Sequence, residues 1–232
     1  MNPKTIKAIL FDSGDTLNRP KTGHWFIPPH FNEIVDTSKL SINSIVVRYA
    51  MNRGRAYLRK NHDIKTEEAE LRLFEGFYSI FLKTAGYPNI DDCIIKALAK
   101  ETVYNDEKFL FFEDVVPTLK VLSSRFQLGV VSVSWPSLER VFINYGIRGY
   151  FKTFVISSMY DQYRSKKPLL EVALEQLGVE PFETIFIDDR EKNLKIARKM
   201  GIKPIKIDRY RNNRSKEYDG ITSLDELTNW LL

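Results

Sequence analysis

The sequence predicts an α/β fold, a doubly wound parallel sheet with a helical domain inserted after its first strand. A short apolar run, Ile6–Phe11, leads directly into the turn-forming residues 12–15, as a buried strand leads into a loop. A helical pattern of apolar residues then extends from about residue 31 to residue 103 without a convincing strand. After Phe109 candidate strands alternate with candidate helices, an order typical of a parallel sheet covered on both faces.

The segment that follows the first strand is irregular. Residues 18–29 include Gly23 and three prolines, which exclude a long helix or a central strand. This loop is longer than the usual connection of about 4–6 residues, a feature that often marks a lid or a binding loop. We therefore expect His24 and Trp25 to contact substrate, with surface or packing roles as the alternative.

The inserted helices have clear ends. Thr66 is followed by two glutamates, as helix starts commonly are, and Gly86 with Pro88 predicts a helix end. Between these points the apolar residues recur at steps of three and four. This stripe predicts the core of the insert rather than a cofactor site, and it consists of Leu71, Phe74, Phe77, Tyr78, Phe81, Leu82 and Ala85.

The second half of the chain supplies the rest of the sheet. Candidate strands cover 127–133, 153–157, 184–187 and 204–207, and candidate helices cover 117–124, 138–145, 168–177 and 191–200. Gly146, Gly178 and Gly201 follow three of these helices, where a left-handed residue commonly ends a helix. Ser223 and Glu226 predict a capping box that starts a last helix. We expect a core of residues 1–20 and 105–232 and a helical domain of residues 21–104.

Composition narrows the class of protein. With 43% hydrophobic and 28% charged residues, the chain of 232 residues has the make-up of a folded globular protein. No apolar run approaches the length of about 20 residues that spans a bilayer, and the only cysteine, Cys93, excludes an internal disulfide. We expect a cytoplasmic protein without membrane partners.

The net charge of +5 favours anionic partners without selecting among them. The densest basic stretch, Arg209–Lys216, has tyrosine among its cations, as a nucleic-acid surface can have. No nucleic-acid-binding motif accompanies it, so we interpret it as a solvated loop. A small phosphorylated metabolite is the expected partner.

Polar residues follow several of the predicted strands. Asp12 follows the first strand, Ser132 ends the second, and Asp188 and Asp189 end the fourth, while Lys167 stands just before a helix. In a doubly wound sheet these positions meet at the carboxyl edge, where ligands bind. Carboxylate oxygens suit Mg²⁺, which commonly binds to one or two carboxylates and a substrate phosphate. The arrangement predicts phosphoryl-transfer chemistry.

Four motifs resemble those of the haloacid dehalogenase-like superfamily. Residues 11–17, FDSGDTL, resemble its first motif, an apolar strand followed by D-x-D-G-T-L, and Ser132 resembles its second. Lys167-Pro168 with the following helix resembles the third, and Asp188-Asp189 the fourth. Their order and the inserted helices also match. The resemblance implies a Rossmann-like core with a helical cap domain and a Mg²⁺-dependent phosphatase activity.

The resemblance also implies roles for the acidic residues. Asp12 would be the nucleophile, forming an aspartyl-phosphate, and its other oxygen would bind Mg²⁺. Asp189 and the backbone carbonyl of Gly14 would complete the protein ligands. Asp188 would contribute indirectly, for example through water.

Three further residues would hold the transferring phosphoryl group. The Ser132 hydroxyl and a neighbouring amide, that of Val133, would bind its oxygens, and Lys167 would neutralise their charge. Lys166 is the alternative cation, but the following proline at the first helical position favours Lys167.

One position departs from the family pattern. Phosphatases of this family place an acid–base aspartate two residues after the nucleophile, where this chain has Gly14, and the aspartate is shifted to Asp15. The loss of such a group typically costs about 10²–10⁴ in rate. Two alternatives to a small-ester phosphatase follow. One is a catalytically weakened member that binds a phosphorylated ligand, and the other is a 2-haloacid dehalogenase, which needs no metal and leaves the Asp188-Asp189 pair unexplained. The sequence names neither the substrate nor the oligomeric state.

Overall fold

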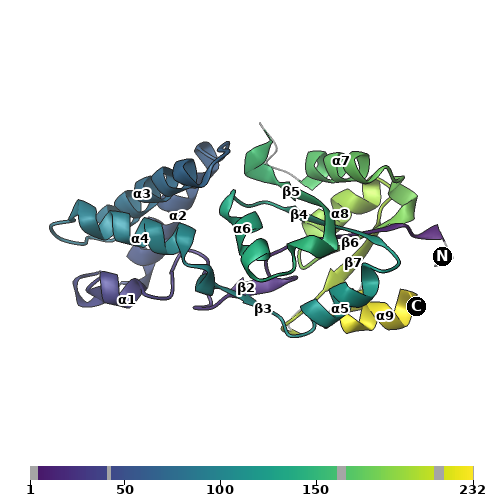
Figure 1. The fold of residues 1–232 in the computed structure, drawn as a ribbon. Helices are drawn as coiled ribbons and strands as arrows, with labels where there is room; N and C mark the ends of the chain where they lie inside the picture. The colour runs from purple at the N-terminus through teal and green to yellow at the C-terminus, as the bar shows by residue number, and fades with distance from the viewer. Residues whose placement is uncertain (1–4, 41–42, 161–165, 212–216, 232) are drawn as a thin grey trace. The chain divides into compact units, whose positions relative to one another are not determined.

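The computed structural model describes residues 5–40, 43–160, 166–211 and 217–231 (Figure 1). The chain divides into two compact units. The α/β unit comprises Met1–Arg19, Phe111–Ser134 and Leu138–Leu232, and the helical unit comprises Pro20–Leu110 and Trp135–Ser137.

A six-stranded sheet forms the centre of the α/β unit, and every strand pairing in it is parallel. In spatial order its strands are β5 (Phe151–Ile156), β4 (Gln127–Ser132), β1 (Ala8–Phe11), β6 (Thr184–Asp188), β7 (Lys203–Ile207) and β8 (Gly220–Ile221). The strands after β1 are added first on one side of it and then, from β6 onward, on the other. The point where the order reverses, between β1 and β6, is where doubly wound sheets bind ligands.

Side chains of β1 alternate between the two faces of the sheet, as the two-residue period of a strand requires. Ala8 and Leu10 belong to a buried cluster with residues of α7 (Lys166–Leu177) and α8 (Glu191–Lys199). Phe11 faces the other way, where its ring meets that of Phe151 at 6.3 Å. The helices that complete this unit are α5 (Val115–Leu122), α6 (Ser137–Asn144), whose first residue counts with the helical unit, and α9 (Asp225–Leu231). Both faces of the sheet are therefore covered, as predicted.

The helical unit is built on three long helices, α2 (Ser44–Lys60), α3 (Glu67–Thr84) and α4 (Asp92–Tyr104), with a single turn, α1 (Phe31–Ile34), before them. The aromatic stripe of α3 forms its core, as the sequence predicts, and the rings of Phe77 and Phe81 stack on each other. Gly54 lets α2 approach α3 closely, since a Cβ at this position would lie 2.5 Å from the ring of Phe77.

Two residues of the connection between β4 and α6, Trp135 and Pro136, and the first residue of α6, Ser137, belong to the helical unit. The ring of Trp135 lies 5.3 Å from that of Phe74 and 5.7 Å from that of His62. Ser137 donates two hydrogen bonds to the buried Glu70, from its amide at 2.8 Å and from its hydroxyl at 2.7 Å. This placement could not be predicted, because the sequence pattern around these residues belongs to the α/β unit.

The unit boundaries differ from the predicted ones on the C-terminal side of the insert. The prediction ends the helical domain at residue 104, whereas the helical unit continues to Leu110. Residues 105–108 are bound to it, since Lys108 donates to the carbonyl of Thr102 and Glu107 pairs with Lys21. At the junctions, β2 (Asn18–Pro20) and β3 (Phe109–Phe111) pair into a two-stranded sheet that the sequence analysis missed because both strands are short.

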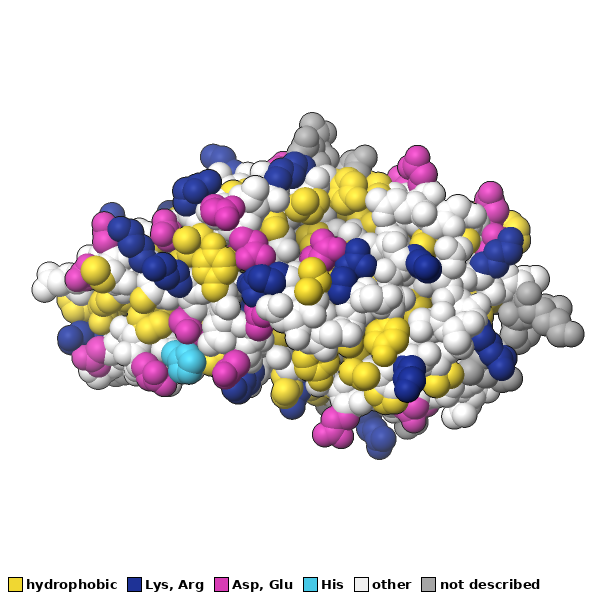
Figure 2. Space-filling view, in the orientation of Figure 1, with side chains coloured by type: hydrophobic (Ala, Val, Ile, Leu, Met, Phe, Trp, Pro, Cys, Tyr) yellow, Lys and Arg dark blue, Asp and Glu magenta, His cyan; other side chains and the backbone are white. Residues whose placement is uncertain are grey.

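Within the described part of the chain, no helix combines the length and the apolarity needed to span a bilayer. Basic and acidic side chains are interspersed over the face shown in Figure 2, so on that face the positive excess is not gathered into one patch. Of the basic stretch 209–216, residues 212–216 lie outside the described residues.

Candidate active site

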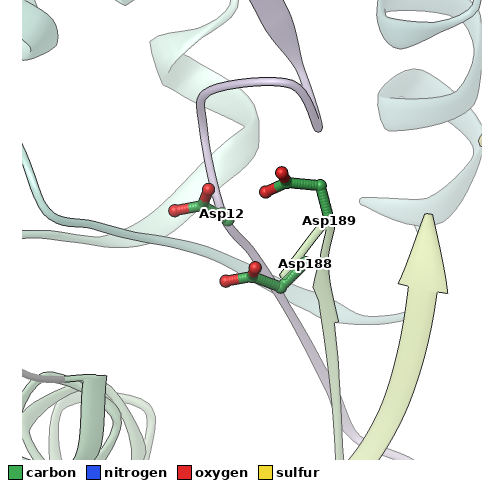
Figure 3. A group of neighbouring side chains, drawn as sticks. All are labelled: Asp12, Asp188 and Asp189. Atoms are coloured by element: carbon green, nitrogen blue, oxygen red, sulfur yellow. The ribbon is translucent and has the colours of Figure 1, made fainter. Parts of the chain in front are cut away.

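Asp12 and the pair Asp188-Asp189 come together because β1 and β6 are neighbours in register. Phe11 pairs with Ile187, and the amide of Asp12 donates to the carbonyl of Ile187 at 2.9 Å. The two strands β1 and β6 therefore end at the same level of the sheet. Carboxylate oxygens of Asp12, Asp188 and Asp189 lie within 4.8 Å of one another, and Figure 3 shows the three groups at these two strand ends.

Asp188 is completely buried, and both of its oxygens accept hydrogen bonds. Oδ1 accepts from the amide of Arg190 at 2.7 Å, and Oδ2 accepts from the side-chain amide of Asn193 at 2.8 Å. These bonds tie the end of β6 to the start of α8. A carboxylate engaged in this way suits the indirect role that the sequence assigns to Asp188.

Asp189 is in the opposite situation. Its buried Oδ1 accepts no hydrogen bond from the described residues, and Nε of Arg190 lies 3.8 Å from Oδ2. Burial, with the charge of Asp12 second, raises the pKa of Asp189 to about 6. A buried acidic oxygen without a donor is costly unless a cation or a proton meets it.

The donor set at this edge fits a hard divalent cation. Mg²⁺ binds oxygen ligands and keeps several waters, so one or two protein carboxylates suffice. The unpartnered oxygen of Asp189 beside Asp12 is the feature that such an ion would satisfy. Asp12 and Asp189 would hold it, with the carbonyl of Gly14 as a further oxygen from the same loop.

The loop from Asp12 to Asn18 closes on itself. The carbonyl of Ser13 accepts from the amides of Leu17 at 2.8 Å and of Asn18 at 3.2 Å, and the Asn18 side chain donates to the hydroxyl of Ser13 at 2.9 Å. Gly14 forms a bridge with Asn18 and is not among the described residues with positive φ. Asp15 is, with φ of 57°. The shifted aspartate therefore occupies the left-handed conformation, which aspartate tolerates better than most residues.

Tyr210, three residues after the last residue of β7, contacts this loop. Its hydroxyl donates to Oδ1 of Asp15 at 3.2 Å. Burial raises the pKa of Tyr210, and the charge of Asp15 adds to the effect. The Asp15 carboxylate is thus held by a phenol, and its charge also contributes to the raised pKa of Asp189.

The side chain of Arg209 holds the loop by hydrogen bonds to its backbone. Its Nε and Nη2 donate to the carbonyl of Thr16 at 3.0 and 2.7 Å, and its Nη1 donates to Asp114 at 2.5 Å. The guanidinium lies 4.1 Å from the ring centre of Phe112 and is almost completely buried. Burial alone would raise the pKa of Asp114, but hydrogen bonds from Arg209, Ser223 and the amide of Leu224 hold it below its usual range.

Arg209 and Tyr210 are the site residues that sequence analysis missed. Sequence analysis interpreted them as part of a solvated basic loop. Arg209 is instead a buried side chain that donates to the carbonyl of Thr16, 193 positions earlier in the chain. The only signal in the sequence was their place directly after a predicted strand of the sheet, the position that also identified Asp12 and Asp188.

The predicted phosphate-binding residues are located at the expected elements. Ser132 ends β4 and is buried, and Val133 follows it in the loop. Lys167 lies in the first turn of α7 with a largely exposed side chain, 3.6 Å from Glu171. Its expected role at a phosphate stays a prediction, as does that of the other two residues, and the side chain of Lys166 lies outside the described residues.

His24 and Trp25 belong to the helical unit. The ring of Trp25 lies 5.5 Å from that of Phe109, and the ring of His24 lies 5.9 Å from that of Phe26. Both side chains are half-buried in the loop after β2. Their contact with substrate stays a prediction.

Comparison with known proteins adds to this geometry. Residues 32–207 match the family model of haloacid dehalogenase-like hydrolases. A glyceraldehyde 3-phosphate phosphatase of Methanopyrus kandleri is 25% identical over 225 residues, which cover 88% of this chain and 84% of that protein.

Solved structures share the fold at low identity. The HAD-hydrolase YfnB of Bacillus subtilis matches with a TM-score of 0.68 at 15% identity, over 97% of this chain and 98% of that one. An L-2-haloacid dehalogenase of Xanthobacter autotrophicus matches with a TM-score of 0.63 at 13% identity, and a HAD phosphatase of Thermococcus onnurineus with 0.58 at 19%, each over the same shares of both chains.

Proposed function

Because the chain belongs to the haloacid dehalogenase-like hydrolases and is therefore a hydrolase, we propose that it is a Mg²⁺-dependent phosphatase of a small phosphorylated metabolite. The observation that carries the proposal is the unpartnered oxygen of Asp189 beside Asp12. The similarity to the glyceraldehyde 3-phosphate phosphatase of Methanopyrus kandleri supports phosphate-ester hydrolysis as the reaction class. A 2-haloacid dehalogenase is disfavoured, because its chemistry gives Asp189 nothing to bind.

In the proposed mechanism, a carboxylate oxygen of Asp12 attacks phosphorus, the bond to the leaving oxygen breaks, and an aspartyl-phosphate forms. Water then attacks that phosphorus and releases inorganic phosphate and the free Asp12 carboxylate. Ser132, the amide of Val133 and Lys167 bind the phosphoryl oxygens. Bound Mg²⁺ would supply positive charge against the oxygens on which negative charge accumulates. Asp188 keeps the end of β6 fixed through Arg190 and Asn193.

We further propose that the helical unit acts as the cap and contributes to substrate choice. The second candidate function, binding of a phosphorylated ligand without efficient turnover, rests on one observation. Gly14 offers no carboxyl group where a family phosphatase has its acid–base aspartate, and Asp15 is held by Tyr210 in the left-handed conformation.

The metal and the nucleophile are tested together. Millimolar Mg²⁺ should raise the melting temperature, because a ligand of the native state stabilises it by mass action. Asp189→Ala should abolish this rise, and Asp12→Asn should remove phosphate release while the protein stays folded. A full Mg²⁺ response in Asp189→Ala, or more than about 1% residual activity in Asp12→Asn, would contradict the assignment.

The two candidate functions are separated by the leaving group. Without a carboxyl group at position 14, aryl and acyl phosphates should be hydrolysed far faster than alkyl phosphates. The double variant Gly14→Asp/Asp15→Gly restores the family order and puts glycine at the positive φ, so it should accelerate alkyl esters by up to about 10²-fold.

The matched control is Asp15→Gly alone, which relieves the backbone without adding the acid. Equal rates for alkyl and aryl esters in the unmodified protein would show that another group already supplies the proton. An absence of turnover with every ester, together with tight phosphate binding, would favour the ligand-binding candidate.

A further inference from the structure

The loop between Thr22 and Ile27 is fixed by its own hydrogen bonds. The Thr22 hydroxyl donates to the carbonyl of Ile27 at 2.6 Å and accepts from the amide of His24 at 3.4 Å. Gly23 has a φ of 80°, a conformation that glycine adopts without strain. The His24 ring is thus held in one place in the helical unit, next to α2.

Both ring nitrogens of His24 face a donor, and a neutral imidazole can accept from only one of them. We assign the acceptor to Nδ1, which faces the amide of Phe26 at 3.2 Å, and the proton to Nε2. Burial, with the charge of Arg55 second, lowers the pKa of His24, so the ring is neutral at pH 7. Nε2 is therefore a donor.

The group facing this donor is another donor. Nη2 of Arg55 lies 3.3 Å from Nε2 of His24, and a guanidinium has no acceptor. The guanidinium of Arg55 also lies 5.4 Å from the ring centre of Phe26, which fixes its orientation. Among the described residues, no carboxylate pairs with Arg55 and no acceptor meets the Nε2 proton. An oxygen placed about 2.9 Å from both nitrogens would accept from both.

The surrounding helix is positive. The 17 residues of α2 contain no aspartate or glutamate and five cations, Arg48, Arg53, Arg55, Arg59 and Lys60. A cluster of one sign attracts an anion rather than a neutral acceptor. Water would satisfy the two donors but would leave the charge of Arg55 unmatched.

We propose that His24 and Arg55 form an anion site that binds a carboxylate or phosphate group.

Histidine NMR tests the site without turnover. The chain has three histidines, so long-range ¹H–¹⁵N spectra can resolve each ring. His24 should show the Nε2-protonated form and shift saturably with inorganic phosphate or acetate. Arg55→Gln should weaken this binding about tenfold or more, since a charge-assisted hydrogen bond is lost. Arg53→Gln, an exposed cation of the same helix, is the matched control and should leave the binding unchanged.

A proton on Nδ1, no saturable shift, or equal weakening in Arg53→Gln would overturn the site.

Discussion

Each unit has an acidic side chain whose pKa is raised by burial, yet the hydrogen bonding of the two differs. In the helical unit both oxygens of Glu70 accept hydrogen bonds from Ser137. In the α/β unit Oδ1 of Asp189 has no donor among the described residues, and Asp12 stands beside it. Glu70 is satisfied by its own chain, and Asp189 is left for a cation to satisfy. A buried acid indicates a site only when its partners are missing.

Asp114 completes the comparison, because it is a partly buried acid of the α/β unit that is paired. Arg209→Ala should have the largest effect on stability, about 3 kcal/mol or more, since it leaves the Asp114 charge partly buried without its cation. The free energy of unfolding from denaturant titration measures this. Arg211→Ala, an exposed neighbour, is the control and should change it by less than about 0.5 kcal/mol. Similar values for both variants would mean that Asp114 does not depend on Arg209.

Asp189→Asn should act in the opposite direction. The pKa of Asp189 is raised from 3.8 to about 6 in the folded protein, so ionisation weakens folding as the pH rises through this range. Without Mg²⁺ at pH 7, the variant should therefore be more stable than the unmodified protein, by about 3 kcal/mol from a shift of about two units.

Below about pH 4 this difference should vanish, because Asp189 is then protonated in both states. Unfolding in EDTA at a series of pH values provides the test. A difference that does not change with pH would place its cause elsewhere than in the charge. With millimolar Mg²⁺ the order of stability should reverse, since only the unmodified protein gains a ligand.

Glu70→Gln should have the smallest effect, a loss of about 1–2 kcal/mol, because an amide can accept only one of the two bonds from Ser137. Its Mg²⁺ response should match that of the unmodified protein. Ser137→Ala keeps the amide donor and should cost less. A variant Glu70→Gln that lost the Mg²⁺ response would break the distinction between the two acids.

The elements and the acidic cluster were predictable because they depend on local pattern and on strand ends. Gly146, Gly178 and Gly201 have positive φ, as their places after helices predict. Asp12 and Asp189 meet because parallel neighbours leave a sheet at the same edge.

Contacts between distant segments were not predictable. The bond of Arg209 to Thr16 and that of Ser137 to Glu70 join residues whose local sequences carry no sign of each other. The left-handed conformation of Asp15 was not predicted either, since nothing in the local sequence distinguishes it from the other turn residues of this loop.

Trp135–Ser137 belong to the helical unit although they lie between two segments of the α/β unit in the sequence, and this limits how the two units can be separated by deletion. The chain passes between the units at four junctions, 19–20, 110–111, 134–135 and 137–138. Deleting residues 20–110 would therefore remove Phe74 and His62 from the Trp135 indole and Glu70 from Ser137. Neither unit is one continuous segment of the chain. A variant that transfers the helical unit to another protein must therefore include Trp135–Ser137 together with the helices.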